Sequence, residues 1–336
     1  MLQEALSAGE AVARLLVADK DAYAALGRHL RAAPPTAALT VARGSSDHAA
    51  GYMAYLIMAR LGRVVASLPM SLVTLYEAPL VSRGMLAIAV SQSGQSPDLL
   101  APMRHFGAGG ATTVALVNDA DSPLARAAQW CMPLHAGTEH SVAATKSFIA
   151  SMVAGARLVA HWQDDKTLLA ALGSLPEALS VAARCDWSAA LPVLASARDL
   201  MVVGRGPGFA VALEAALKFK ETSALQAEAF SGAEIQHGPM ALVEPGYPLL
   251  VLAMRGPAMT GLVELAQAMR LRGAQVLLAA PAEVAGRDLT LPTAATPDLD
   301  PIVAIQAFYV LVEQLARARG LDPDHPRHLS KVTRTR

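Results

Sequence analysis

The sequence predicts an α/β protein with two tandem copies of one doubly wound domain, each with a parallel sheet between layers of helices. Short apolar runs alternate with helical stretches along the whole chain, as in folds built from parallel strands. The second half also repeats the first, because Arg205-Gly206 follows Arg43-Gly44 at an offset of 162 residues and two further strand patterns recur at about the same offset. Finally, a loop rich in hydroxyl groups follows the apolar run 85–90, which is typical of a buried parallel strand.

The elements are read in chain order from these apolar patterns. In the first half, the pattern predicts a helix over 5–32, a strand over 38–42, a helix over 49–60, strands over 64–67 and 85–90, a helix from 97, a strand over 112–117 and a helix over 143–162. In the second half, it predicts strands over 200–204, 249–253 and 275–279 and a helix over 214–221.

These elements set the expected domain boundaries. The first domain, with an N-terminal helix, is expected over residues 1–175, the second over 190–320, and a C-terminal tail over 321–336. We expect the junction near residues 173–190, where Gly173, Pro176 and Pro192 cluster.

Composition restricts the class of protein. The chain has 336 residues, of which 53% are hydrophobic and 17% charged, so it has enough apolar material for two cores. Lys+Arg and Asp+Glu both number 28, and the zero net charge argues against nucleic acid as a main partner. Cys131 and Cys185 are the only cysteines, too few for a disulfide framework, and they suit a reducing cytosol.

The N-terminus and the apolar runs predict a cytoplasmic protein with no membrane partner. Met1-Leu2-Gln3-Glu4 lacks the basic and apolar regions of a signal peptide. The apolar runs are shorter than the roughly 20 residues that cross a bilayer.

The hydroxyl-rich loop is the strongest sign of a ligand site. It reads Ser91-Gln92-Ser93-Gly94-Gln95-Ser96 and leads into a helix that begins at Pro97. Gly94 allows close approach of backbone N–H groups, and the positive end of the helix points back at the loop. Because the loop contains no lysine or arginine, we expect neutral donors to bind a phosphate group here.

Two glycine turns fall at the carboxyl ends of predicted strands, where doubly wound sheets bind ligands. They contain Gly44 and Gly206, and each could also be a tight turn without chemistry. Arg205-Gly206-Pro207-Gly208 matches a dinucleotide fingerprint only in part, and no acidic residue closes the next strand. An NAD site is therefore not expected, and the sequence predicts no cofactor and no metal ion.

Three further segments carry groups suited to acid–base or amine chemistry. Glu214, Lys218 and Glu221 share one helix face, although Glu214 and Lys218 could equally form a surface ion pair. His237 precedes Gly-Pro on a turn, where it either titrates at a site or is simply solvated. Lys331 lies in a basic tail, and most such tails are solvated.

Together these segments resemble the sugar isomerase (SIS) family, in particular the isomerase half of glucosamine-6-phosphate synthase, from about residue 38 to the C-terminus. The motifs in the family's order are Ser91 to Ser96, Gly137-Thr138-Glu139…Ala144-Thr145-Lys146, Glu214 to Glu221, Glu228-Ala229-Phe230…Gly232-Ala233-Glu234…His237-Gly238-Pro239 and Pro326-Arg327-His328-Leu329-Ser330-Lys331.

The resemblance implies a role for each matching residue. The sugar phosphate is expected to contact Ser45, Ser46, Ser91, Gln92, Ser93, Ser96 and Val142. Glu221 is expected to move a proton between C1 and C2, supported by Lys218 and Glu214. His237 opens the pyranose ring and in this family reaches in from a neighbouring subunit, so a homodimer is expected. The resemblance also implies that Lys331 lies over the site and can form a Schiff base with the keto sugar.

Two departures from the synthase shape the predicted function. The chain opens at Met1-Leu2, where the synthase carries a glutaminase domain, so we expect no glutamine-dependent synthesis. Ala144 replaces a serine that contacts substrate in the synthase, which bears on the choice of sugar.

The leading prediction is an SIS-type glucosamine-6-phosphate deaminase that yields fructose 6-phosphate and ammonia by ring opening and C1–C2 proton transfer. A phosphosugar isomerase, a deaminase for another hexosamine 6-phosphate and a sugar-phosphate sensor without turnover remain alternatives. The direction of the reaction and the involvement of a separate glutaminase also stay open.

Overall fold

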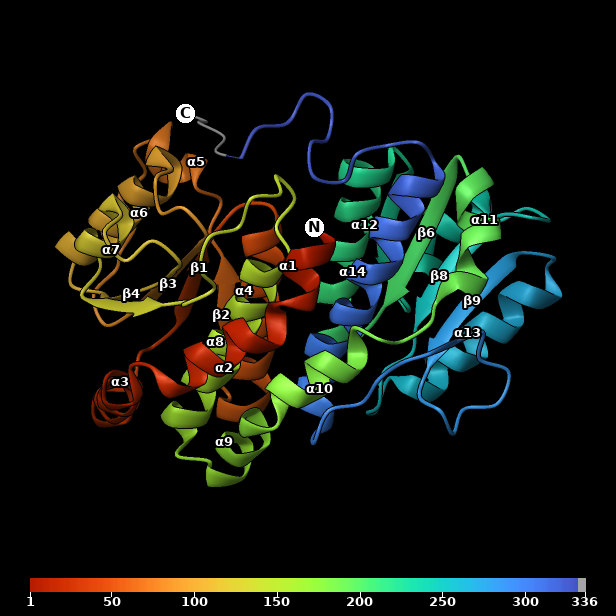
Figure 1. Ribbon diagram of the computed structural model, residues 1–336. Helices are drawn as coiled ribbons and strands as arrows, with labels where there is room; N and C mark the ends of the chain where they lie inside the picture. Colours follow the sequence, from red (N-terminus) through yellow and green to blue (C-terminus); the bar gives the residue numbers. More distant parts are fainter. Residues whose placement is uncertain (332–336) are drawn as a thin grey trace. The chain divides into compact units, whose positions relative to one another are not determined.

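The computed structural model describes residues 1–331 and contains two five-stranded sheets in which every strand pair is parallel (Figure 1). The first-sheet unit comprises residues 10–139, 146–173 and 330–331. The second-sheet unit comprises residues 1–9, 140–145 and 174–329. Of the predicted tail over 321–336, residues 332–336 lie outside the described residues.

The strands are short, as expected for buried parallel sheets. They are β1 (Ala38–Val41), β2 (Val65–Ser67), β3 (Leu86–Ser91), β4 (Thr112–Val117), β5 (Trp130–Pro133), β6 (Asp199–Gly204), β7 (Gln226–Ser231), β8 (Pro248–Leu252), β9 (Gln275–Ala280) and β10 (Leu289–Thr290).

Helices connect and cover these strands. The α-helices are α1 (Leu2–Leu6), α2 (Ala8–Val17), α3 (Lys20–Ala32), α4 (Ser45–Leu61), α5 (Ser71–Thr74), α6 (Pro97–Ala108), α7 (Pro123–Ala127), α8 (Lys146–Gln163), α9 (Lys166–Gly173), α10 (Leu175–Ala182), α11 (Leu191–Ser196), α12 (Phe209–Ser223), α13 (Met259–Leu271) and α14 (Asp300–Ala318). The 3₁₀ turns are η1 (Ser188–Ala190), η2 (Gly206–Gly208), η3 (Glu234–His237), η4 (Pro239–Leu242) and η5 (Pro297–Leu299).

The two sheets have the same topology. The first has the order β2-β1-β3-β4-β5, and the second, read from its β7 edge, has the order β7-β6-β8-β9-β10. If the strands of each sheet are numbered by their order along the chain, both sheets have the order 2-1-3-4-5. This is a doubly wound arrangement, in which the connections reverse direction between the first and third strands. The predicted fold class, α/β with two tandem doubly wound domains, is confirmed.

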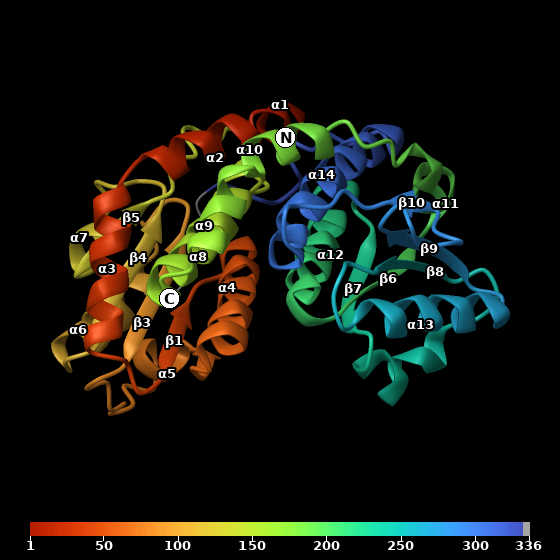
Figure 2. The same cartoon turned by 90° about the horizontal axis from the view of Figure 1, so that it is seen from below.

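In the first-sheet unit, helices cover both faces of the sheet (Figure 2). On one face, Ala87 and Ala89 of β3 pack against Met103 and Phe106 of α6 and Leu124 of α7. Helices α4 and α8 pack closely against each other and also contact the sheet. Every residue of β3 is buried, which explains why it appears in the sequence as a continuous apolar run.

In the second-sheet unit, α13 covers one face, with Leu262 and Met269 packed against Val251 of β8. Helices α12 and α14 pack against each other. The segment Pro297–Ala318 is long and apolar enough to cross a membrane by length and composition, contrary to the expectation that every apolar run is too short. Because 89% of its most apolar window is buried inside the protein, its apolar surface is accounted for by the core.

Several elements differ from the sequence expectations. The single helix predicted over 5–32 is three helices, with one break at Ser7 and a second at Asp19, whose φ of 51° is left-handed. The helix predicted over 143–162 begins at Lys146 and ends at Gln163. The predicted junction contains α10, which buries Leu175 and Leu179 and packs on α14. Neither β7 nor α14 was predicted.

Candidate functional site

The hydroxyl-rich loop joins the end of β3 to the start of α6, as predicted. Ser91 is buried, and its Oγ accepts a hydrogen bond of 3.0 Å from the backbone N–H of Gly94. The Oγ of Ser93 accepts a second bond, of 3.3 Å, from the N–H of Gln95. The serines therefore stabilise the turn, and α6 directs its free N–H groups towards it.

Gly94 is required by both conformation and space. Its φ of 62° lies in the left-handed region that favours glycine. A Cβ atom here would lie 2.2 Å from Oγ of Ser122 and 2.9 Å from a methyl carbon of Val117. The close approach of the loop to the segment after β4 therefore depends on the missing side chain.

A second polar turn lies beside this loop, because β1 pairs directly with β3 and both strands end at the same edge of the sheet. Gly44 has a φ of 54°, and α4 begins at Ser45 and Ser46, both partly buried. A guanidinium nitrogen of Arg43 lies 3.6 Å from Oδ2 of the buried Asp98 in the first turn of α6. Two helix N-termini with hydroxyl groups thus flank the point where the strand order reverses, an arrangement that suits an anion.

The three charged residues predicted on one helix face do share a face of α12. Nζ of Lys218 lies 3.3 Å from Oε1 of Glu214 and is also hydrogen-bonded to Oε2 of Glu221. The hydroxyl of Tyr309, on α14, donates to the same Oε1 of Glu214 at 3.2 Å. Lys218 and Glu214 are completely buried, so the alternative of a surface ion pair is wrong.

Electrostatics keep this buried lysine charged. Burial disfavours the ammonium ion and would lower its pKa, but the adjacent Glu214 and Glu221 outweigh burial and raise the pKa of Lys218. The side chain of Glu221 is 22% exposed, so it is the member of the cluster that solvent or a ligand reaches. The cluster therefore holds the carboxylate of Glu221 in one orientation through its bond to the buried ammonium group of Lys218.

His237 ends η3 in the second-sheet unit and is exposed. Gly238 follows with a φ of 147°, which only glycine adopts readily and which turns the chain sharply into η4. The prediction that the imidazole lies on a turn is confirmed.

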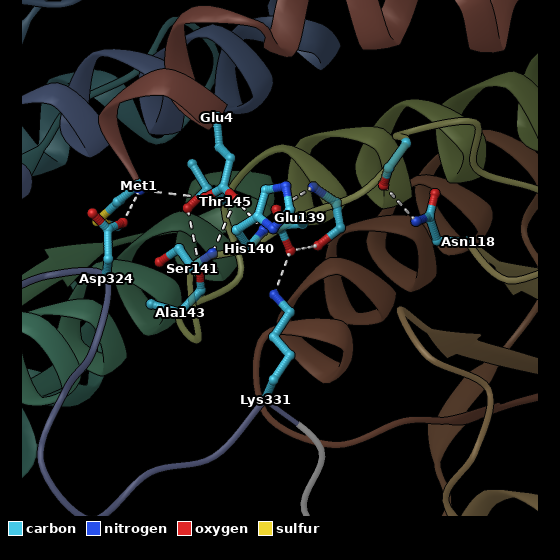
Figure 3. Close-up of polar contacts among 12 residues, drawn as sticks. Met1, Glu4, Asn118, Glu139, His140, Ser141, Ala143, Thr145, Asp324 and Lys331 are labelled. Carbon is cyan, nitrogen blue, oxygen red and sulfur yellow. Dashed lines mark hydrogen bonds and ion pairs between the residues drawn. The ribbon is translucent and has the colours of Figure 1, made fainter.

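Lys331 contacts Glu139, which lies in the segment before α8 (Figure 3). Its Nζ donates a hydrogen bond of 3.1 Å to Oε2 of Glu139, whose side chain is completely buried. Glu139 belongs to a motif quoted above, but the sequence did not predict its contact with the tail. The sequence feature that could have indicated this contact is a lone acidic residue, Glu139, seven positions before the helix that starts at Lys146.

The turn after β8 in the second sheet, which corresponds to the serine loop after β3, contains an arginine and no run of serines. Arg255 follows β8, and its Nε and Nη2 bond the two carboxylate oxygens of Asp300 at 2.7 and 2.6 Å. The hydrogen bond to Asp300 raises the pKa of Arg255. This bidentate pair fixes the start of α14, and no run of hydroxyl side chains stands there, so the two repeats present different groups at this position.

The predicted residues divide between the two units. The first-sheet unit holds Ser45, Ser46, Ser91, Gln92, Ser93, Ser96 and Lys331. The second-sheet unit holds Val142, Glu214, Lys218, Glu221 and His237. Within residues 1–331, no group of three or more His, Cys, Asp or Glu side chains could hold a metal ion.

Comparison with known proteins identifies the class. The SIS domain matches twice, over residues 35–160 and 193–316, which coincide with the two sheets. Glutamine–fructose-6-phosphate aminotransferase (isomerizing) from Zymomonas mobilis is 33% identical over 311 residues, covering 87% of this chain and 51% of its own. The same-named protein from Symbiobacterium thermophilum is 35% identical over 311 residues, covering 87% and 50%.

A solved structure extends the match to full length. The crystal structure of a proposed phosphosugar isomerase from Silicibacter pomeroyi DSS-3 superimposes with a TM-score of 0.92 and 44% identity, covering 96% of this chain and 99% of that one. This chain belongs to the SIS family and contains two SIS domains. It is similar to the isomerizing half of the aminotransferases and spans about half the length of those curated relatives.

Proposed function

We propose that the chain is an SIS-type deaminase that converts glucosamine 6-phosphate and water to fructose 6-phosphate and ammonia. The observation that carries the proposal is the buried cluster on α12, in which Lys218 holds the partly exposed carboxylate of Glu221. A protein that only binds sugar phosphates has no need of a buried ammonium ion behind an accessible carboxylate.

Binding of the phosphate is assigned to the loop Ser91–Ser96 together with Ser45 and Ser46. The support is the position of both turns at the reversal point of the first sheet, where helix N-termini favour an anion. A dianion held there contributes binding energy remote from the reacting carbons. Val142 is proposed as a further contact.

The chemistry follows from the side chains. His237 transfers the proton that opens the ring, because imidazole titrates near neutral pH. Glu221 takes the proton from C2 of the open amino sugar and returns it to C1, which leaves an imine at C2. Water then adds to C2 and ammonia leaves, so no oxidant or further reactant is needed. Lys331 is proposed to form an imine with the keto product.

The assembly is proposed to be a homodimer in which His237 serves the site of the neighbouring subunit. Its exposed position on a sharp turn supports this role. Light scattering of the purified chain tests whether it is a dimer. Mixing His237→Ala protein with Glu221→Gln protein tests whether His237 acts in the site of the neighbouring subunit. Recovery of activity only in the mixture supports it, and an inactive mixture that has exchanged subunits contradicts it.

The central experiment measures ammonium released from glucosamine 6-phosphate, with galactosamine 6-phosphate as a matched substrate. Fast release from the first and slow release from the second supports the proposal. The name of the Silicibacter protein favours one second candidate, a phosphosugar isomerase. Interconversion of fructose 6-phosphate and glucose 6-phosphate without any ammonium release would establish that alternative. Binding of the sugar phosphates without turnover would instead indicate a sensor.

A further inference from the structure

Glu139 is a buried carboxylate that the proposed mechanism does not use. Its Oε2 lies 3.1 Å from Nζ of Lys331, and its side chain is completely buried while that of Lys331 is 27% exposed. Both residues belong to the first-sheet unit, although they are 192 positions apart in the chain. The contact therefore joins Lys331 to the segment before α8 within this unit.

Helix α8 also holds Glu139 in place, through hydrogen bonds from Ser147. Its Oε1 accepts a hydrogen bond of 3.0 Å from the backbone N–H of Ser147, and its Oε2 accepts one of 2.6 Å from the Ser147 hydroxyl. Ser147 is in the first turn of α8, where free N–H groups and the helix dipole favour an anion. Helix α8 is buried along almost its whole length, so the carboxylate is supported by a rigid element.

We propose that Glu139 is a positioning residue for Lys331, which it holds by charge and hydrogen bonding at the N-terminus of α8. This inference rests on the proposed function, in which Lys331 forms an imine with the keto sugar. A lysine on a terminal segment reaches a carbonyl carbon in one orientation only if its nitrogen is held in place, and Glu139 supplies that constraint.

The same contact gives the proton of the ammonium ion a destination. The ammonium group of Lys331 passes one proton to Oε2 of Glu139, and the freed lone pair forms a bond to C2 of the sugar. The carbonyl oxygen takes up one proton from the nitrogen and the proton held by Glu139 and leaves as water, while the C=N bond forms as a protonated imine and Glu139 is again a carboxylate. The overall change is amine plus ketone to imine plus water, and it needs no oxidant or reductant.

The first test does not use substrate. Trace acetic anhydride labels lysines, and mass spectrometry gives the labelling of Lys331 relative to the exposed Lys20 and Lys166. Glu139→Gln should raise this ratio at least about threefold, because Nζ of Lys331 is then no longer held against a buried carboxylate and the reagent reaches it more easily. Ser147→Ala, which keeps the carboxylate, should change it by less than about twofold.

An unchanged Lys331 labelling ratio in a folded Glu139→Gln protein would overturn the proposal. Equal increases of this ratio in Glu139→Gln and Ser147→Ala would also overturn it, because they would mean that Glu139 only caps α8. Glu139→Asp, which keeps the charge but shortens the side chain by one methylene, is measured in parallel. It should give an intermediate ratio, and a wild-type ratio there would also contradict the proposal. Thermal unfolding by circular dichroism checks that each variant is folded.

The second test traps the imine. Fructose 6-phosphate and sodium borohydride should leave a reduced sugar adduct on Lys331 of the wild type. The adduct should form at least about tenfold more slowly in Glu139→Gln, and its rate in Ser147→Ala should be within about threefold of wild type. Equal trapping rates in Glu139→Gln and wild type would overturn the positioning role. Absence of any adduct from the wild type would contradict the proposed role of Lys331 in the reaction, while the labelling ratio still decides the contact with Glu139.

Discussion

Nζ of Lys218 lies 3.3 Å from Oε1 of Glu214, and neither side chain is exposed to solvent. An ammonium ion in such a place is stable only with a carboxylate beside it, because removing either charge from water carries a large desolvation penalty. Glu214 therefore pairs with Lys218 within the core, and the hydroxyl of Tyr309 donates a hydrogen bond to Glu214. The second carboxylate that Lys218 bonds, Glu221, lies one turn further along α12 at the boundary with solvent.

Replacement of this lysine should destabilise the protein strongly. Lys218→Met leaves the carboxylate of Glu214 buried without its cation, and we expect the free energy of unfolding to fall by about 3–5 kcal/mol. Urea unfolding followed by circular dichroism measures the change. The double variant Glu214→Gln/Lys218→Met removes both buried charges and should recover at least half of the loss. Equal stability of the single variant and wild type would contradict a buried, charged pair.

Replacement of Glu221 should separate binding from turnover. Glu221→Gln keeps a side chain of the same shape but removes the base, so ammonium release from glucosamine 6-phosphate should fall by about 100-fold or more. The sugar phosphate should still raise the melting temperature as it does in wild type. The matched control is Glu264→Gln on the exposed side of α13, which should retain activity. Loss of binding together with turnover would argue against a role confined to proton transfer.

The serine loop should not tolerate a side chain at Gly94. Gly94→Ala puts a methyl group 2.2 Å from Oγ of Ser122 and requires alanine at a φ of 62°, so we expect a loss of about 1–3 kcal/mol in unfolding free energy. Protection by glucosamine 6-phosphate against thermal unfolding should also weaken. Gly173→Ala is the control, since a Cβ atom at that position would have no other atom within 4 Å. Similar behaviour of the two variants would show that the loop geometry does not depend on Gly94.

Stability should decrease in mild acid because of His161. Burial first, and then the nearby charges of Arg157 and Arg31, lower the pKa of His161 in the folded protein. The unfolded chain therefore binds a proton more tightly than the folded one, so this histidine's contribution is fully present at neutral pH and is lost as the pH falls through and below about 6.5. His161→Gln should reduce the difference between urea unfolding free energies at pH 7.5 and 5.5. An unchanged difference in a folded variant would exclude this cause.

Local sequence was enough to predict most of the strands and the serine loop. The run 85–90 is apolar at every position because β3 is covered on both faces, and Gly94 marks the turn because only glycine adopts its conformation without strain. The shared orientation of Glu214, Lys218 and Glu221 follows from helical spacing alone. The strand β7 was not predicted, since Gln226 and Glu228 are exposed residues within an edge strand and break the apolar pattern.

The linear order of residues is sufficient to predict the repeat, the order of most strands and helices, and the residues that match the SIS family. These features depend on short-range spacing and on residue type. The folded structure was needed to learn which charges are buried and what they contact. Lys218 lies in the core and not on the surface, Arg255 binds Asp300, and Lys331 binds Glu139. Burial and partnership depend on contacts between residues distant in the chain, and a linear pattern of charges does not encode those contacts.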